Sequence, residues 1–312
     1  MSTTLSYIQF YPTLRCNYSC YFCFNRATAK RDDIDLHDFE AVVSNIKKTG
    51  INNIDILGGE PTLHPQLPKL IDITYNYGLK VTMSSNGTNV NILNTLSAKY
   101  SKESLMIGIS INSDTVSKEL NTYILRHKPV LKNVFTRNST IPEPCKKYIM
   151  LPGIDYYLLY MDIINKSDLK HSVPFYAYYS LINELKNRYK NLNAVYCSGF
   201  IPDIENYEVL EHVRCPAGTT KVSILPDGSV YPCYLFFRYK EFKLGSILKD
   251  DLDNMLQNPI LDFFRKIDKN TCTNKGCKLH NLCHGGCPAI SYILHKDMSL
   301  SDPRCWGRGL RI

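Results

Sequence analysis

Three cysteines near the start of the chain limit its fold and chemistry more than any other feature. Cys16, Cys20 and Cys23 follow one another at C-x3-C-x2-C spacing within one short loop. Three thiols cannot all be paired with one another, so this loop is not a local disulfide framework. Cysteine thiolates hold iron–sulfur clusters, and three of them leave one iron of a four-iron cubane without a protein ligand. A small molecule can bind and react at such an open iron, as at the open position of a catalytic zinc site.

A second motif, Gly58-Gly59-Glu60-Pro61, follows a short apolar segment that predicts a strand over 53–57. Glycine lets the backbone approach a ligand closely, and the Glu60 carboxylate can accept a hydrogen bond from an ammonium group. Phe22 lies between the second and third cysteines, where an aromatic ring can pack against a bound ligand. The glutamate motif is weak alone, but behind the cysteine loop it indicates a small-molecule site beside a metal centre.

The two motifs together resemble the signature of the radical S-adenosylmethionine (SAM) enzymes. This resemblance implies that Cys16, Cys20 and Cys23 bind a [4Fe–4S] cluster whose open iron chelates S-adenosyl-L-methionine. One electron then cleaves SAM to methionine and a 5′-deoxyadenosyl radical, which abstracts a hydrogen atom from an unactivated carbon. The Gly-Gly-Glu turn would hold the methionine amine. The alternative is a zinc knuckle, although zinc sites favour two separated pairs of ligands.

Polar residues at the ends of later predicted strands are the remaining candidate contacts to SAM. By the resemblance, the ribose or the carboxylate of SAM is contacted by Ser85, Asn86, Ser110 and Asn112. Polar residues also end many strands because they favour turns. An ordinary turn is therefore the alternative for each of these four residues.

Segments with strand and helix patterns alternate along the first 195 residues. The strands are predicted at 5–11, 53–57, 80–84, 105–112, 134–136 and 157–164. The helices are predicted at 35–49, 67–77, 90–100 and 174–189, and the proline-containing segments 142–144 and 152–153 are predicted as loops. Such alternation is typical of an α/β fold with parallel strands, whose chemistry gathers at the carboxyl ends of the strands. The resemblance specifies a partial (β/α)6 TIM-like radical SAM barrel.

Eight of the 12 cysteines lie between residues 197 and 305, where the composition changes. A hairpin is predicted around the Asp227-Gly228 turn. The cysteines then follow in the order Cys215, Cys233, Cys272, Cys277, Cys283, Cys287 and Cys305. This order resembles the SPASM extension of radical SAM enzymes, a small cysteine-rich domain that carries auxiliary iron–sulfur clusters. We therefore divide the chain into a radical SAM partial barrel over 1–195 and a SPASM auxiliary-cluster domain over 196–312.

The resemblance also implies which cysteines share a cluster. A first auxiliary [4Fe–4S] cluster would be bound by Cys215, Cys233 and Cys287. A second auxiliary [4Fe–4S] cluster would be bound by Cys272, Cys277, Cys283 and Cys305. The C-x4-C spacing that opens this quartet departs from the usual C-x2-C, which changes the expected loop geometry of one cluster. Zinc is the alternative for the whole region, because thiolates suit both metals.

Cys197 is the nearby candidate for a fourth ligand of the first auxiliary cluster. If it is not a ligand, that cluster has an open iron where a substrate can bind. A free Cys197 thiol that donates a hydrogen atom would instead make this residue catalytic. A buried structural cysteine is the remaining alternative.

Charge and hydropathy exclude several classes of protein. The 37 Lys and Arg against 29 Asp and Glu give a net charge of +8, spread along the chain rather than in blocks. This charge suits an anionic partner and does not require a nucleic acid. The sequence shows no signal peptide and no apolar stretch long enough to span a bilayer, so we expect a cytoplasmic protein without a membrane partner. Closely spaced cysteines in such a protein indicate metal binding rather than disulfides.

Most SPASM enzymes whose role is understood modify peptides or proteins. The resemblance thus implies an oxidoreductase that matures a peptide or protein substrate through a crosslink or a side-chain oxidation, with a flavodoxin- or ferredoxin-like electron donor. Only fifteen residues precede Cys16, where many peptide maturases carry a leader-binding domain. One alternative is radical oxidation of a small molecule, such as an alcohol or a tetrapyrrole side chain. The other is a non-catalytic iron–sulfur electron carrier, which has no need of the Gly-Gly-Glu turn.

Overall fold

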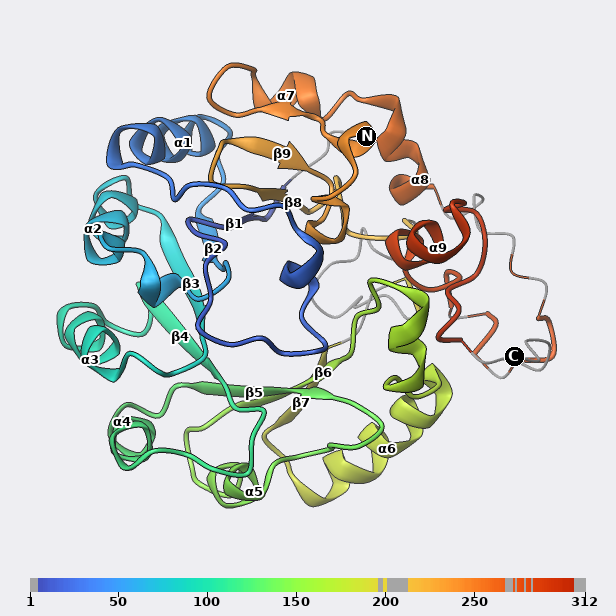
Figure 1. Ribbon diagram of the computed structural model, residues 1–312, viewed down its shortest axis with the longest axis horizontal. Coiled ribbons are helices and arrows are strands. Elements are labelled where there is room, and N and C mark those ends of the chain that lie inside the picture. The colour runs from blue at the N-terminus through green and yellow to red at the C-terminus, as the bar shows by residue number, and fades with distance from the viewer. Residues whose placement is uncertain are drawn as a thin grey trace.

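The structure is a computed structural model that describes residues 5–195, 199–200, 213–266, 272, 274–277, 279–281 and 283–305. Its strands are arranged as a ring, and the helices of the first two thirds of the chain lie on the outside of that ring (Figure 1). The dark blue loop that follows the first strand projects over the centre of the ring in this view. This loop contains the three N-terminal cysteines.

The strands of the described residues form one ten-stranded sheet, in the order β10-β9-β8-β1-β2-β3-β4-β5-β6-β7. From β1 to β7, each strand pairs in parallel with the next. The strands span Tyr7–Phe10 (β1), Asn53–Ile56 (β2), Lys80–Ser85 (β3), Leu105–Ser110 (β4), Val130–Phe135 (β5), Tyr156–Tyr160 (β6), Leu192–Val195 (β7), Lys221–Ile224 (β8), Ser229–Tyr231 (β9) and Gly245–Ser246 (β10). This parallel arrangement confirms the predicted α/β fold.

Helices connect consecutive parallel strands and cover the outer face of the ring (Figure 1). The α-helices span Leu36–Lys48 (α1), Leu67–Asn76 (α2), Val90–Lys99 (α3), Lys118–His127 (α4), Glu143–Tyr148 (α5), Phe175–Arg188 (α6), Leu252–Met255 (α7), Asp262–Arg265 (α8) and Pro288–His295 (α9). The 3-10 turns span Phe24–Ala27 (η1), Pro61–Leu63 (η2), Lys166–Lys170 (η3), Tyr234–Phe236 (η5), Lys240–Phe242 (η6) and Pro259–Leu261 (η7). Among these described helices, none combines the length and apolar character needed to cross a bilayer.

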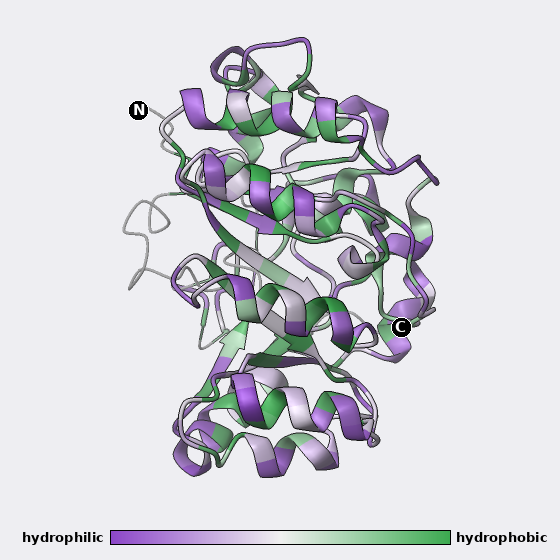
Figure 2. Cartoon of the chain, turned by 90° about the vertical axis from the view of Figure 1, so that its left-hand side faces the viewer, coloured by the Kyte–Doolittle hydropathy of each residue, from purple (hydrophilic) through white to green (hydrophobic). Residues whose placement is uncertain are grey.

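Each helix that covers the ring is amphipathic, as its sequence pattern predicts. In α1, Phe39, Val42, Val43 and Ile46 recur at helical spacing and are buried. Figure 2 shows hydrophilic and hydrophobic residues alternating along the helices on this side of the molecule. The apolar stripe faces the sheet, since the Phe10 ring of β1 lies 5.2 Å from the Phe39 ring between centroids.

The two faces of the strands differ in burial, because alternate residues of a strand point to opposite faces. The residues that face the helices are buried, whereas the residues between them on β2, β3, β5 and β6 are half-buried or exposed. The interior of a TIM barrel is normally filled by bulky side chains. The inner face of this ring is instead only partly buried, so a cofactor or a substrate group can reach it.

The C-terminal part of the described chain continues the same sheet. Strand β8 pairs in parallel with β1 and in antiparallel fashion with β9, and β10 then pairs with β9. The β8–β9 connection contains the predicted Asp227-Gly228 turn, and Gly228 has a φ of +75°, which favours glycine. The boundary between residues 195 and 196 remains a prediction, and β8 lies directly against the first strand of the barrel.

Within the barrel, the differences between the predicted and the observed elements lie mainly in residues 113–195. The segment 142–144 is predicted as a loop but begins α5 instead, with Pro144 in the first helical turn. Proline is tolerated there because the N–H that it lacks would have no partner. The strand predicted at 134–136 begins at Val130, and neither α4 nor β7 is predicted from the pattern.

Candidate functional site

The cysteine loop lies at the carboxyl end of β1 and is fastened to the loops that follow other strands. Asn17 Nδ2 donates to Thr88 Oγ1 at 2.9 Å, and Asn86 Nδ2 donates to Asn17 Oδ1 at 2.8 Å. Both Asn86 and Thr88 follow β3. The Tyr21 hydroxyl donates to Thr136 Oγ1, directly after β5, at 3.1 Å. The loop is therefore held across the mouth of the ring, where the carboxyl ends of the strands meet.

Two arginines fix the ends of this loop. Arg15 forms an ion pair with Asp33 and donates to the Leu63 carbonyl at 2.7 Å. Arg26 of η1 forms an ion pair with Asp168 of η3, which is 3% exposed and lies beyond β6. The segment between the two arginines contains all three cysteines, so its path is set on both sides.

The three thiols of the loop are free, and they become more buried along the chain. Cys16 is exposed, and Cys20 and Cys23 are half-buried. Burial raises the pKa of the Cys20 and Cys23 thiols, and repulsion from the neighbouring thiolates adds to the rise. A metal centre that binds all three sulfurs as thiolates would relieve this repulsion.

The separation of these sulfurs fits a cluster better than a single ion. A tetrahedral zinc ion with Zn–S bonds of about 2.3 Å brings its sulfur ligands within about 4 Å of one another. In the described ranges, one group of three ligand atoms lies within 4.8 Å of one another, and it contains no cysteine. The three thiols are thus close enough to repel one another but too far apart for a single-ion cage.

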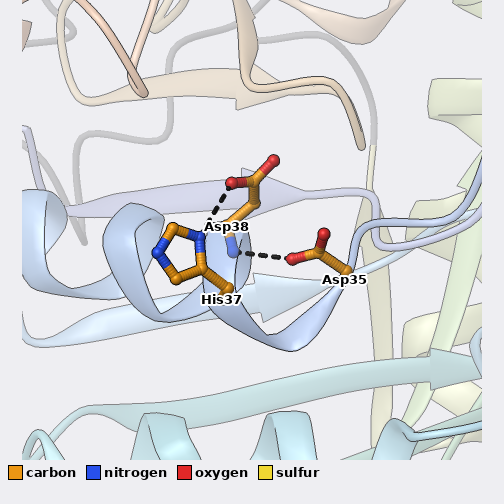
Figure 3. A group of neighbouring side chains, drawn as sticks. All are labelled: Asp35, His37 and Asp38. Atoms are coloured by element: carbon orange, nitrogen blue, oxygen red, sulfur yellow. Dashed lines mark hydrogen bonds and ion pairs between the residues drawn. The ribbon is translucent and has the colours of Figure 1, made fainter.

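The group that does meet this distance is Asp35, His37 and Asp38 at the exposed start of α1 (Figure 3). The Asp35 carboxylate accepts the Asp38 N–H at 2.8 Å, which is the usual bond of a helix N-cap. His37 Nδ1 lies 3.3 Å from Asp38 Oδ1. Helix capping accounts for this cluster, so we assign no metal to it.

Gly58 and Gly59 pack directly against the backbone of the cysteine loop. A Cβ added at Gly58 would lie 2.5 Å from the Thr13 carbonyl oxygen, and one added at Gly59 would collide with the Arg15 carbonyl. The Gly59 N–H donates to Thr13 O at 2.9 Å, and the Glu60 N–H donates to Arg15 O at 2.7 Å. The side of each glycine that lacks a Cβ faces this loop, so the glycines position the cysteines relative to Glu60.

The Glu60 carboxylate is 1% exposed and is bound by four donors. Its Oε1 atom accepts from the Thr62 N–H at 3.1 Å, from the Thr62 hydroxyl at 2.7 Å and from the Ser85 hydroxyl at 2.8 Å. Its Oε2 atom accepts from the Asn86 N–H at 2.6 Å. A carboxylate offers about four lone-pair directions, so Oε2 can accept one further donor. Ser85 and Asn86, predicted as SAM contacts, hold this carboxylate in place.

Glu60→Gln is expected to lower the free energy of unfolding by about 1–3 kcal/mol, because the amide group would face N–H and O–H donors in a buried place. Urea unfolding followed by circular dichroism measures this change. Glu40→Gln is the matched control, because Glu40 is exposed and receives one long hydrogen bond of 3.4 Å from Tyr77. Equal stability of the two variants would show that the four donors do not require a carboxylate.

The other predicted cofactor contacts lie on the inner face or beside it. Ser110 ends β4 and is in register with Lys132 of β5. Asn112 Oδ1 accepts the Val134 N–H at 2.8 Å and so supports the backbone of β5. Phe22 is half-buried and packs against the core. The assignment of these residues to SAM remains a prediction.

Two charged residues on the inner face, Asp55 of β2 and Lys132 of β5, belong to the same region and are not predicted as site residues from the sequence. Lys132 of β5 donates to the Ser84 hydroxyl of β3 and passes over Gly108, where an added Cβ would lie 3.4 Å from its Nζ. Burial lowers the pKa of Lys132, and the negative charges of Asp55 and Glu60 raise it. Both charged residues alternate with apolar residues on β5 and β2, which is the sequence signal for an inner face.

Asp55 provides a pH-dependent test of this inner face. Burial raises its pKa to about 6, although Lys132 and Lys221 oppose the rise. The folded state then binds a proton more readily than the unfolded state, so ionisation of Asp55 destabilises the protein as the pH rises through about 6. Asp55→Asn is expected to raise the melting temperature relative to the parent at pH 8, and by less at pH 5. A difference in melting temperature that is the same at pH 5 and at pH 8 would contradict the raised pKa of Asp55.

The C-terminal thiols fall into two neighbourhoods. Burial raises the pKa of Cys233 to about 12, and the nearby Cys287 thiol adds to the rise. Burial likewise raises the pKa of Cys283 to about 12, with contributions from Cys305 and Cys272. The same division separates the two predicted ligand sets, which remain predictions.

The remaining predicted cysteines are placed as follows. Cys215 is buried, and its N–H donates to the Phe264 carbonyl at 2.9 Å. Cys277 is half-buried, and its sulfur lies 3.4 Å from the Leu279 N–H. Cys197 lies outside the described residues.

Comparison with known proteins adds two family matches. Residues 10–153 match the radical SAM superfamily, and residues 215–288 match SPASM, an iron–sulfur cluster-binding domain. The order of the two matches is the predicted order, which confirms the resemblance stated from the motifs.

Individual relatives are similar to most of this chain at low identity. The antilisterial bacteriocin subtilosin biosynthesis protein AlbA of Bacillus subtilis (strain 168) is 24% identical over 88% of this chain, and the chain spans 65% of AlbA. A tungsten-containing aldehyde ferredoxin oxidoreductase cofactor-modifying protein of Pyrococcus furiosus is 23% identical, over 97% of this chain and 92% of the relative. The crystal structure of Streptococcus suis SuiB bound to the precursor peptide SuiA is 19% identical, with a TM-score of 0.72 over 98% of this chain and 76% of SuiB. The last likeness supports the fold.

Proposed function

Because the chain is a radical SAM enzyme with a C-terminal SPASM domain, we propose that it modifies a peptide or protein substrate by radical chemistry. The proposed reaction begins with abstraction of a hydrogen atom and ends in a crosslink or an oxidised side chain. One observation carries the proposal. The cysteine loop is bound to the backbone of Glu60 at the carboxyl end of β2, and the charged residues Asp55 and Lys132 lie on the half-buried inner face within electrostatic reach of each other.

Different residues of this region would bind the cluster and the two charged groups of the SAM methionine. Cys16, Cys20 and Cys23 would bind a [4Fe–4S] cluster, which, once reduced, supplies the 5′-deoxyadenosyl radical from SAM. Glu60 Oε2 would accept a hydrogen bond from the methionine amine. Lys132 would pair with the methionine carboxylate, because its ammonium lies within electrostatic reach of Glu60, and these two groups of an amino acid are adjacent.

The C-terminal cysteines would bind two auxiliary [4Fe–4S] clusters that accept the electron left on the substrate. We assign this role to residues 196–312 and the SAM-dependent step to residues 1–195. A flavodoxin- or ferredoxin-like protein of the cytoplasm would supply the first electron. The positive net charge of the chain suits such an acidic partner.

A peptide substrate is supported by what is known of two similar proteins from their names. AlbA takes part in the biosynthesis of a bacteriocin, and SuiB has been crystallised with its precursor peptide. The accessible inner face suits a substrate that reaches the site with one side chain while the rest stays outside. The second candidate is a small molecule, which the cofactor-modifying relative of Pyrococcus furiosus favours.

Deuterium transfer from an unidentified substrate would distinguish these candidates. Cells of the source organism are grown in deuterated medium, and their extract is incubated with the reconstituted enzyme, SAM and dithionite. Mass spectrometry then measures deuterium in the 5′-deoxyadenosine product, since the abstracted atom is carried there. A duplicate extract is treated with protease, which is then inactivated before the enzyme is added.

We expect deuterium transfer with the intact extract and the loss of most of this transfer after proteolysis. Transfer that survives proteolysis and passes through a small-pore filter would indicate a small-molecule substrate. The absence of any 5′-deoxyadenosine would contradict enzyme activity altogether and favour an electron carrier.

A further inference from the structure

A buried ion pair lies between the last two cysteines of the described chain. Asp302 and Arg304 are each 1% exposed. Arg304 Nη2 donates to Asp302 Oδ2 at 2.6 Å, and Arg304 Nε donates to Asp302 Oδ1 at 3.1 Å. The same carboxylate accepts the Cys287 N–H at 3.0 Å, and the Cys305 N–H donates to the Asp302 carbonyl at 2.9 Å. The pair therefore sets the backbone at Cys287 and at Cys305.

Arg304 also reaches the barrel. Its Nη1 atom donates to the Met161 carbonyl, beyond the end of β6, at 2.8 Å and lies 3.8 Å from Asp162 Oδ1. Its guanidinium lies over the Tyr160 ring, 4.7 Å from the centroid. The Phe175 N–H at the start of α6 donates to the Arg304 carbonyl at 3.0 Å. One side chain thus connects the cysteine-rich region to the carboxyl end of a barrel strand.

The Asp162 carboxylate, which follows β6, also connects to the segment that contains Cys233. The Tyr234 hydroxyl donates to Asp162, and Tyr234 directly follows Cys233. The Tyr234 ring lies 4.7 Å between centroids from the Phe24 ring, which directly follows Cys23. The Asp162 side chain is 27% exposed, so it is partly open to solvent.

These contacts form one polar path between two cysteines of the same neighbourhood. The path runs from Cys233 through its neighbour Tyr234 to Asp162, and from there through Arg304 and Asp302 to the Cys287 N–H. Cys233 and Cys287 also lie close enough for their thiolates to repel each other. Both ends of the path therefore converge on the place where we propose the first auxiliary cluster.

We infer that Asp162 and Arg304 are positioning residues that fix this auxiliary cluster against the end of β6 and set its reduction potential. The inference rests on the proposed function, because the cluster and its ligands belong to that proposal. Charges and hydrogen bonds around cysteine ligands tune the potential of iron–sulfur clusters. If Arg304 only held the two regions together, apolar packing would do so equally well, because a buried ion pair gives little net stability.

The signs of the expected shifts follow from the charges. Asp162→Asn removes a negative charge and keeps the shape, so the cluster should accept an electron more easily and its potential should rise. Arg304→Met removes a positive charge, so the potential should fall. Arg304→Lys keeps the positive charge but loses the planar guanidinium, so its reduction potential should lie close to that of the parent.

Redox titration of the reconstituted holoenzyme, followed by electron paramagnetic resonance, measures these shifts. Adding SAM identifies the signal of the N-terminal cluster, and the signals that do not respond to SAM are the auxiliary ones. Arg238→Met is the matched control. Its guanidinium also reaches from the C-terminal region to a carbonyl after β6, that of Ile164 at 2.6 Å, but it takes no part in the path.

We expect Asp162→Asn and Arg304→Met to shift one auxiliary signal in opposite directions, with Arg238→Met unchanged. Auxiliary signals that are present in the parent but unmoved in Asp162→Asn would overturn the inference and leave the proposed function intact. If Arg304→Met fails to fold, Asp162→Asn still decides, because it is isosteric and partly exposed. A parent enzyme without auxiliary signals would overturn the cluster assignment and this inference together.

Discussion

Replacing Cys16, Cys20 and Cys23 together by alanine is expected to abolish the formation of 5′-deoxyadenosine from SAM, while roughly eight of twelve irons remain bound. The reason is that these thiols are held across the mouth of the ring, in a loop bound to the backbone of Glu60, and are separated from the C-terminal thiols in sequence. The product is measured by liquid chromatography after reduction with dithionite, and iron is measured on the same sample.

Cys145→Ala is the matched control for this variant. Cys145 is buried in α5 and lies far in the sequence from both groups of closely spaced cysteines. We expect Cys145→Ala to retain both the full iron content and SAM cleavage. SAM cleavage by the triple variant at the parent rate would show that the radical arises elsewhere.

Gly59→Ala is expected to remove the N-terminal cluster almost as completely, without changing any ligand. The new methyl group would collide with the Arg15 carbonyl and the Leu14 carbonyl, which are backbone atoms and cannot rotate away. The cysteine loop would have to separate from Glu60, whose N–H donates to Arg15 O at 2.7 Å. We expect a loss of about 3 kcal/mol in the free energy of unfolding from this overpacking.

Iron analysis and urea unfolding measure the two consequences separately. Gly108→Ala is the control, because the atoms nearest to its new Cβ are the flexible end of Lys132, at 3.4 and 3.5 Å. That variant should keep its iron and most of its stability. If Gly59→Ala also kept a full complement of iron, the close packing of the two loops would not be what positions the cysteines.

The parts of the site that the sequence reveals are those that a short local pattern specifies. C-x3-C-x2-C places three thiols in one loop by spacing alone, and Gly-Gly-Glu is informative because it follows the next parallel strand. The helices up to residue 100 are also predictable, since their apolar residues recur at helical spacing, and the first two are followed by glycines with positive φ, Gly50 and Gly78. These features depend on neighbours in the chain.

The remaining features depend on residues that are distant in sequence. Pairing of β8 with β1 joins segments more than two hundred residues apart and leaves no periodic signal in either one. Lys132 reads as an ordinary strand residue until the ring brings it toward Glu60. The Asp302–Arg304 pair reads as part of a polar turn, and its role becomes visible once Cys287 and the end of β6 lie against it. Helix α5 is missed because proline suggests a loop unless its position in the first turn is known.

The content of iron, acid-labile sulfide and zinc in the anaerobically reconstituted protein tests the central claim most directly. Three cubane clusters predict roughly twelve irons and twelve sulfides per chain, with no zinc. About four irons accompanied by zinc would mean that the C-terminal thiols form structural zinc sites. The redox role assigned to the SPASM domain would then be wrong, and a redox-neutral radical reaction would replace the oxidation proposed here.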